Sequence, residues 1–97
     1  MIDVQGVSTE KVAGGKLLRV KVDFDSKINK VQITGDFFAH PEDVIEKIES
    51  SLGGISFNEE RIQKAVEKVI DETKADIVGI DAAAIARNVI KAVSGSQ

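Results

Sequence analysis

The chain changes its hydrophobic period once, and this change limits the folds that are open to it. From residue 17 to residue 36 apolar and polar side chains alternate, the period of strands with one wet face. From Pro41 onward apolar residues recur every three or four positions, the period of amphipathic helices. Strands followed by helices are typical of α+β folds. We therefore expect a small antiparallel sheet of two to three strands with three helices packed on one face.

Two alternating runs predict a β-hairpin. They span residues 17–25 and 28–36, and Asp25-Ser26-Lys27 between them is typical of a turn. A weaker run at residues 4–12 is a candidate third strand, and Gly14-Gly15 separates it from the hairpin. The faces that we expect to be buried comprise Leu18, Val20, Val22 and Phe24 in the first run, and Val31, Ile33 and Gly35 in the second.

Three helices are predicted in the second half of the chain. Pro41 suits the first position of one helix, and Gly53 is a natural stop for it. The second helix is expected to begin near Asn58 as its cap, and the third at Asp81. Their buried stripes are expected to be Val44, Ile45, Ile48 and Leu52, then Ile62, Ala65, Val66, Val69 and Ile70, then Ile85, Val89, Ala92 and Val93.

Composition excludes several classes of site. The 97 residues suffice for a single domain over 1–97. The chain has no cysteine and one histidine, so it lacks a thiolate nucleophile, and we expect it to hold no metal. No apolar run approaches the ~20 residues that span a bilayer, and the N-terminus lacks the apolar stretch of a signal peptide. We expect a cytoplasmic location without membrane contact.

Charge is unevenly distributed along the chain. Residues 1–40 carry six basic and five acidic groups, whereas residues 41–97 carry seven basic and eleven acidic groups, for a net charge of -3. A nucleic-acid-binding domain is expected to be basic, so we expect no nucleic-acid partner. An anion contact, if the chain makes one, is expected in its first half.

Two segments depart from the residue patterns expected of a hydrophobic core. In Gly14-Gly15-Lys16, backbone N–H groups and an ammonium can approach a phosphate or a carboxylate, although the spacing of a complete phosphate loop is missing. The alternative is a flexible connection with a solvated lysine.

The second segment is Gly35-Asp36-Phe37-Phe38, in which the two rings cannot both point inward from a strand. Either the strand ends and the chain bends or one ring faces a partner; the alternative is a corner with both rings in the core. Gly35 can permit a bulge or a close backbone approach.

His40 lies directly before Pro41, where a helix cap is expected. A catalytic histidine needs an orienting carboxylate and a nucleophile nearby, and the sequence offers neither in a recognisable context. We interpret His40 as a capping or surface residue. We expect the carboxylates of Glu42, Asp43, Glu46 and Glu49 to be solvated. By residue chemistry alone, this chain shows no catalytic group.

Residues 11–52 resemble a known family. Gly15-Lys16-Leu17 opens the hairpin, Gly35-Asp36-Phe37-Phe38 ends it, and an acidic helix follows that ends at Leu52-Gly53. In this combination the chain resembles the C-terminal domain of lipoate–protein ligases, in the stand-alone form found as a small second subunit.

The resemblance implies an accessory role. A catalytic large subunit would bind ATP, Mg and lipoate, form lipoyl-adenylate and transfer lipoyl to a lysine of an acceptor domain. Acceptors in such systems are the E2 component of 2-oxoacid dehydrogenases and the glycine cleavage H protein. This chain alone would bind none of these cofactors. An alternative is a non-enzymatic adaptor or scaffold domain related in fold to iron–sulfur assembly proteins. The residues expected to support the adenylation site or contact the partner are Gly14, Gly15, Lys16, Gly35, Asp36, Phe37, Phe38 and His40.

Overall fold

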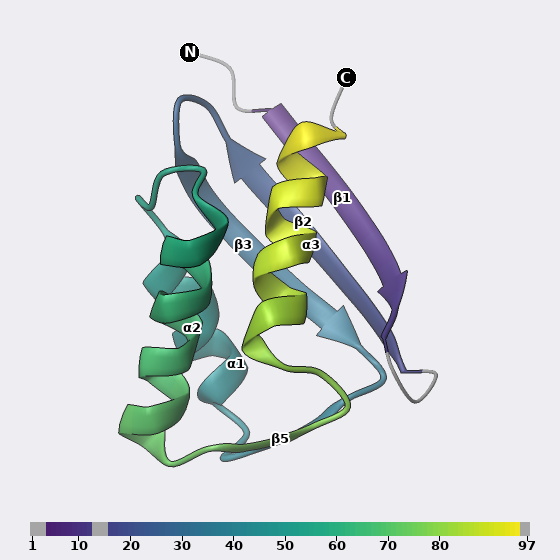
Figure 1. Cartoon of the computed structure of the whole chain (residues 1–97), viewed down its shortest axis with the longest axis vertical. Coiled ribbons are helices and arrows are strands. Elements are labelled where there is room, and N and C mark those ends of the chain that lie inside the picture. The colour runs from purple at the N-terminus through teal and green to yellow at the C-terminus, as the bar shows by residue number, and fades with distance from the viewer. Residues whose placement is uncertain (1–3, 13–15, 96–97) are drawn as a thin grey trace.

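The computed structural model describes residues 4–12 and 16–95. A three-stranded sheet comes first along the chain, and helices dominate the second half (Figure 1). The elements are β1 Val4–Lys11, β2 Leu17–Phe24, β3 Ile28–Gly35, β4 Phe38–His40, α1 Val44–Leu52, α2 Glu59–Thr73, β5 Asp76–Val78 and α3 Ala82–Ser94.

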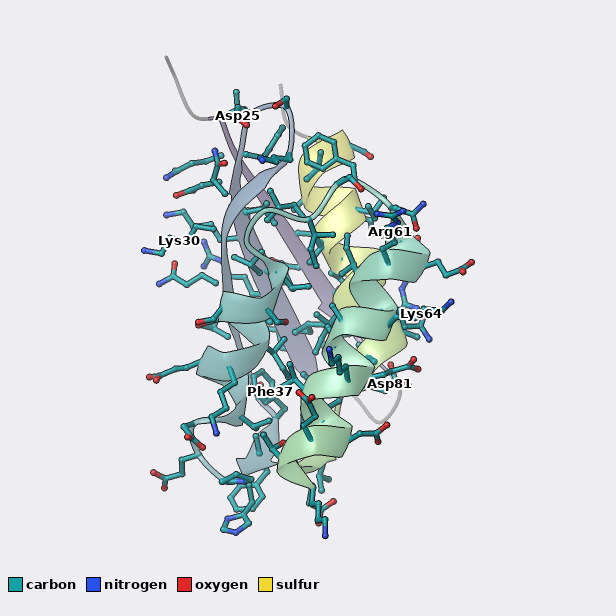
Figure 2. All side chains as sticks on the ribbon, turned by 90° about the vertical axis from the view of Figure 1, so that its left-hand side faces the viewer. Asp25, Lys30, Phe37, Arg61, Lys64 and Asp81 are labelled. Carbon is teal, nitrogen blue, oxygen red and sulfur yellow. The ribbon has the colours of Figure 1, made fainter. Side chains whose placement is uncertain are left out.

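The larger sheet is antiparallel in the order β1-β2-β3. Helix α3 packs on β1 and β2, α1 packs on β3, and α2 packs against α1 and α3. All three helices therefore lie on one side of this sheet, and its other face is open to solvent (Figures 1 and 2). The predicted α+β architecture is confirmed, including the third strand that the weak run at residues 4–12 suggested.

The predicted hairpin faces are mostly confirmed. Leu18, Val20 and Val22 are fully buried, and Val31 and Ile33 are nearly so. The pairing register shifts at the start of β3, where Phe24 pairs with Ile28 but Asp23 pairs with Lys30. The extra residue forms a bulge, which also turns Ile28 inward. Gly35 was expected on the buried face and is exposed, because β3 ends there.

Two of the three predicted helix starts are confirmed by their caps. The Asn58 side chain accepts a hydrogen bond from the Arg61 backbone N–H at 3.0 Å, and the Asp81 side chain accepts one from Ala84 N–H at 2.8 Å. The prediction that Pro41 begins the first helix is wrong, because α1 begins at Val44. Residues 41–43 form a turn, closed by a hydrogen bond from the Val44 N–H to the Pro41 carbonyl at 3.0 Å, and the three residues before it form strand β4, which pairs with β5.

A polar cluster joins β1 to α3. The Asn88 side chain is fully buried; its amide donates to the Ala84 carbonyl at 2.8 Å and to the Glu10 carboxylate at 3.1 Å, and its oxygen accepts from the Ser8 hydroxyl at 2.7 Å. The Arg87 guanidinium donates two hydrogen bonds to Glu10, and Lys91 Nζ adds a further contact at 3.3 Å. Each buried polar side-chain atom of this cluster has a partner, so the cluster can fix the edge strand to the helix without leaving a buried polar group unsatisfied.

Stability is expected to depend on pH through Glu10. Hydrogen bonds from Arg87, and secondarily from Asn88 and Lys91, lower the pKa of Glu10 from 4.5 to about 2. A carboxylate with a lowered folded-state pKa stabilises the fold above its ordinary pKa, and the stabilisation is lost as the pH falls from about 4.5 to 2. The shift corresponds to ~3 kcal/mol. Because Arg87 and Lys91 are 41% and 56% exposed, we expect solvent screening to leave ~1–2 kcal/mol.

Denaturant unfolding of the wild type and Glu10→Gln between pH 7 and pH 2.5 measures this contribution. The free-energy difference between the two proteins should be largest at neutral pH and shrink toward pH 2.5. A difference that stays constant across this range would contradict the assigned role of the Glu10 carboxylate.

Candidate functional site

The end of β3 leads into the part of the molecule where most of the predicted site residues gather. At Gly35 the backbone passes directly over Leu17: the Asp36 N–H donates to the Leu17 carbonyl at 2.9 Å, and a Cβ on Gly35 would overlap that carbonyl oxygen. Of the two roles left open for Gly35, a bulge or a close backbone approach, the structure shows the close approach. The register shift of β3 lies at its other end.

The two adjacent phenylalanines are separated by the bend after β3. Phe37 is half-buried and packs against the core, and Figure 2 shows it lying inside the molecule. Phe38 begins β4 and is 70% exposed. The alternative with both rings in the core is therefore wrong. The strand ends, the chain bends, and one large apolar ring is left in solvent.

Strands β4 and β5 form a two-stranded antiparallel ribbon. Phe38 pairs with Val78, Ala39 with Ile77, and His40 with Asp76. Ala39 and Ile77 pack against the core, so the alternation of a strand turns the other four side chains outward. We call Phe38, His40, Asp76 and Val78 the ribbon tip.

The ribbon tip presents an apolar pair to solvent. Phe38 and Val78 are direct cross-strand neighbours and are 70% and 57% exposed. Cross-strand pairs of an aromatic and a β-branched residue normally stabilise a sheet by sharing a buried face. An exposed pair of this kind is instead typical of a contact surface.

His40 and the four carboxylates of the following segment take different roles. His40 is an exposed residue at the end of β4; the surface interpretation is confirmed and the capping one is wrong, because Asp43 precedes α1. Glu42, Asp43 and Glu46 are exposed as expected. Glu49 is not simply solvated: its carboxylate accepts a hydrogen bond from the Ile33 backbone N–H at 2.7 Å and so covers part of the β3 edge.

Lys16 lies beside the segment that connects β5 to α3. Its backbone carbonyl accepts a hydrogen bond from the Val12 N–H at 2.8 Å. Its side-chain stem lies over Gly79, with Cγ 3.1 Å from the position that a Gly79 Cβ would occupy, and Phe37 Cβ lies 3.4 Å from the same position. Lys16 is exposed, so its ammonium is available to an anion. Gly14 and Gly15 lie outside the described residues.

The sequence prediction missed β5 and with it Asp76, Val78 and Gly79. A strand of three residues is too short to show a period. The available signal was the apolar pair Ile77-Val78 between Asp76 and Gly79, a short apolar run bounded by turn-forming residues.

Chemically, the arrangement suits docking and electrostatic support. It combines an exposed apolar pair with an accessible ammonium group. No group of three or more histidines and carboxylates among residues 4–12 and 16–95 is arranged to hold a metal ion. None of the described helices is long and apolar enough to cross a membrane.

The fold and this site define a small α+β domain with an exposed apolar pair on its two-stranded ribbon. The family described as bacterial lipoate protein ligase C-terminus matches residues 7–88, and the chain belongs to this family. The resemblance seen in residues 11–52 is thereby confirmed.

A solved structure extends this relation to nearly the whole chain. The protein is similar to a chain from the structure of an archaeal lipoylation system, a bi-partite lipoate protein ligase and its E2 lipoyl domain from Thermoplasma acidophilum. The TM-score is 0.72 at 27% identity, and the alignment covers 95% of this chain and 97% of the other. The search of curated proteins gave no match.

Proposed function

We propose that this chain is the accessory subunit of a two-component lipoate–protein ligase and takes part in the ATP-dependent activation of lipoate. The family match over residues 7–88 carries the proposal. The similarity to a chain of a bi-partite ligase supports it, because the two chains cover each other almost completely.

In the proposed complex a catalytic large subunit binds lipoate, ATP and Mg, and this chain binds none of them alone. The product, lipoyl-adenylate, then modifies a lysine of an acceptor domain, such as the E2 component of 2-oxoacid dehydrogenases or the glycine cleavage H protein. We propose a cytoplasmic complex. The E2 lipoyl domain described with the Thermoplasma ligase supports the assignment of the acceptor class.

The accessory role has a physical basis in positioning. Adenylation requires the lipoate carboxylate and the α-phosphate to be aligned in a site that excludes water, and alignment with fixed charges supplies several kcal/mol of the barrier reduction. A separate domain can order the active-site loops of its partner without donating a catalytic group. We assign the ribbon tip to docking and the Lys16 ammonium to support of the adenylation site. The segment between the Lys16 region and the ribbon tip consists of Gly35, Asp36 and Phe37, and we assign it to holding these two parts of the site together.

The isolated chain is expected neither to hydrolyse ATP nor to make lipoyl-adenylate. The reason is that its site offers an ammonium and an apolar surface but no nucleophile paired with a base. Pyrophosphate release with lipoate and ATP should be absent for the chain alone and the catalytic subunit alone, or much slower than for the mixture. Robust pyrophosphate release by this chain alone would overturn the proposed function.

Truncation of the ribbon tip is expected to weaken the complex. Phe38→Ala removes the most exposed large apolar side chain among the described residues. An aromatic anchor that becomes buried in an interface typically accounts for ~2 kcal/mol or more of binding, about thirtyfold in Kd. Val78→Ala should weaken binding less, because it removes less apolar surface. Calorimetric titration of the catalytic subunit with each variant measures the effect.

A matched control for this prediction is Val7→Ala in β1. Val7 is 49% exposed, close to the 57% of Val78, but lies away from the ribbon tip. If Val7→Ala weakens the complex as much as Phe38→Ala does, the docking surface has been placed on the wrong part of the molecule.

A further inference from the structure

The sheet face opposite the helices is a polar surface that the proposed activation step does not use. The register of the three strands shows which residues share it: Gln5, Asp23 and Lys30 form one row, Val7, Lys21 and Gln32 the next, and Thr9, Arg19 and Thr34 the third, followed by Lys11 and Leu17. We call these residues the open face. In Figure 2 Lys30 points away from the helices.

Cations dominate the open face. Lys11, Arg19, Lys21 and Lys30 lie on it, with Asp23 as its single carboxylate. Each ion pair among the described residues involves a cation of a helix, namely Lys47, Lys64, Arg87 or Lys91. The four cations of the open face are left without an ion-pair partner in that part of the chain. Positive charge is thus concentrated on one side of a protein whose net charge is -3.

Asp23 lies opposite Lys30, but no carboxylate lies opposite Lys11, Arg19 or Lys21 in the register. The face therefore carries an excess of positive charge that cross-strand pairs do not balance, and this excess is slightly unfavourable in the isolated chain. A partner with carboxylates facing it would balance that excess. Electrostatic complementarity of this kind raises association rates and fixes orientation more than it raises affinity.

The catalytic subunit and the acceptor domain, the two protein partners of an accessory subunit, require contacts of different lifetimes. The catalytic subunit remains bound, which suits an apolar contact such as the ribbon tip. The acceptor domain must leave after each transfer, which suits a polar, charged contact that forms and dissociates quickly. The open face has the second character.

We infer that the open face is a docking surface for the acceptor domain and binds a carboxylate-rich surface of that domain. The inference rests on the proposed function for the identity of the partner and on the charge distribution for its chemistry. A nucleic-acid strand fits less well, because none of the four phenylalanines lies on the open face to stack on bases.

Charge reversal tests the inference in the intact complex. The variant Arg19→Glu/Lys30→Glu reverses two exposed cations of the open face, and Arg61→Glu/Lys68→Glu reverses two exposed cations of α2 as the matched control. The measurement is binding of the fluorescently labelled lipoyl domain of the same organism to the reconstituted ligase, at low and at moderate salt.

We expect the open-face variant to bind the acceptor at least about tenfold more weakly at low salt, and the control to stay within about twofold of wild type. Wild-type binding should weaken as salt is raised, whereas binding by the open-face variant should change little. In the transfer reaction from pre-made lipoyl-adenylate, KM for the acceptor should rise while kcat is unchanged. The neutral variant Arg19→Gln/Lys30→Gln should be intermediate in all three measurements.

The inference is wrong if the open-face variant binds the acceptor as the wild type does, or if the α2 control loses as much acceptor binding. It is also wrong if the open-face variant keeps acceptor binding and loses only binding of the catalytic subunit, or only binding of a short oligonucleotide. The proposed function fails separately. A complex that binds the acceptor in this charge-dependent way but makes no lipoyl-adenylate would retain the docking surface and refute the ligase assignment.

Discussion

Replacement of Lys16 by alanine is expected to slow lipoate activation by the reconstituted complex about 30- to 1000-fold, because removing a charge directed at a transition state costs ~2–4 kcal/mol. Lys16 is exposed, and its Cγ lies beside Gly79, the residue that follows Val78 of the ribbon tip. Transfer from pre-made lipoyl-adenylate should be nearly unchanged, because that half reaction no longer requires the triphosphate to be positioned.

Both half reactions are measured with the same complex, by pyrophosphate release and by acceptor modification. Lys27→Ala is the control, since Lys27 is an exposed lysine in the turn at the opposite end of β2. Lys16→Arg need not restore the rate, because a guanidinium is a planar fork and an ammonium is a compact charge. Equal loss in both half reactions would indicate a damaged interface. No loss in either would make Lys16 a solvated lysine worth well under ~1 kcal/mol.

Gly35→Ala is expected to destabilise the fold by about 2–4 kcal/mol, the combined effect of overpacking and backbone strain. A Cβ at this position overlaps the carbonyl oxygen of Leu17, and backbone cannot move aside as the end of a flexible side chain can. The φ angle of +152° adds to the cost. To relieve the overlap, β2 and β3 must separate where β2 begins and β3 ends. Phe37 and Phe38 follow directly after this end of β3.

Gly54→Ala is the matched control for this effect. Gly54 also has a positive φ, +86°, but among the described residues no atom beyond its chain neighbours lies within 4 Å of the position of its missing Cβ. Its substitution therefore isolates the conformational cost of about 1 kcal/mol. Thermal unfolding should show a fall in Tm for Gly35→Ala at least twice that for Gly54→Ala. Equal falls would mean that the contact with Leu17 relaxes at little cost.

Local patterns in the sequence predicted the elements whose stability depends on near neighbours. Alternation in residues 17–25 identified the buried face of β2, because successive side chains of a strand point to opposite faces. Asn58 and Asp81 marked two helix starts, because each side chain accepts a hydrogen bond from a backbone N–H three residues ahead. The adjacency of Phe37 and Phe38 indicated that both rings cannot point inward from one strand, but it left open a corner with both in the core; the structure packs Phe37 on the core and exposes Phe38.

Features that join distant segments were decided by the tertiary structure. The Glu10–Arg87 and Ser8–Asn88 contacts link residues 77 and 80 positions apart, and no local pattern marks Glu10 as different from any solvated glutamate. Strands β4 and β5 exist through their pairing with each other, since three residues carry too little period to specify a strand alone.

Some features of the candidate site are likewise visible in the sequence, and others depend on the tertiary structure. The sequence by itself determined that Gly35, Phe38 and Lys16 were unusual, because a glycine, a doubled aromatic and a glycine-flanked lysine depart from core patterns that depend only on neighbours in the chain. The positions of Val78 opposite Phe38 and of Gly79 beside Lys16 depend on the tertiary structure. These contacts form because burial of apolar residues in the connection from α2 to α3 and in the segment after β3 brings the two segments together.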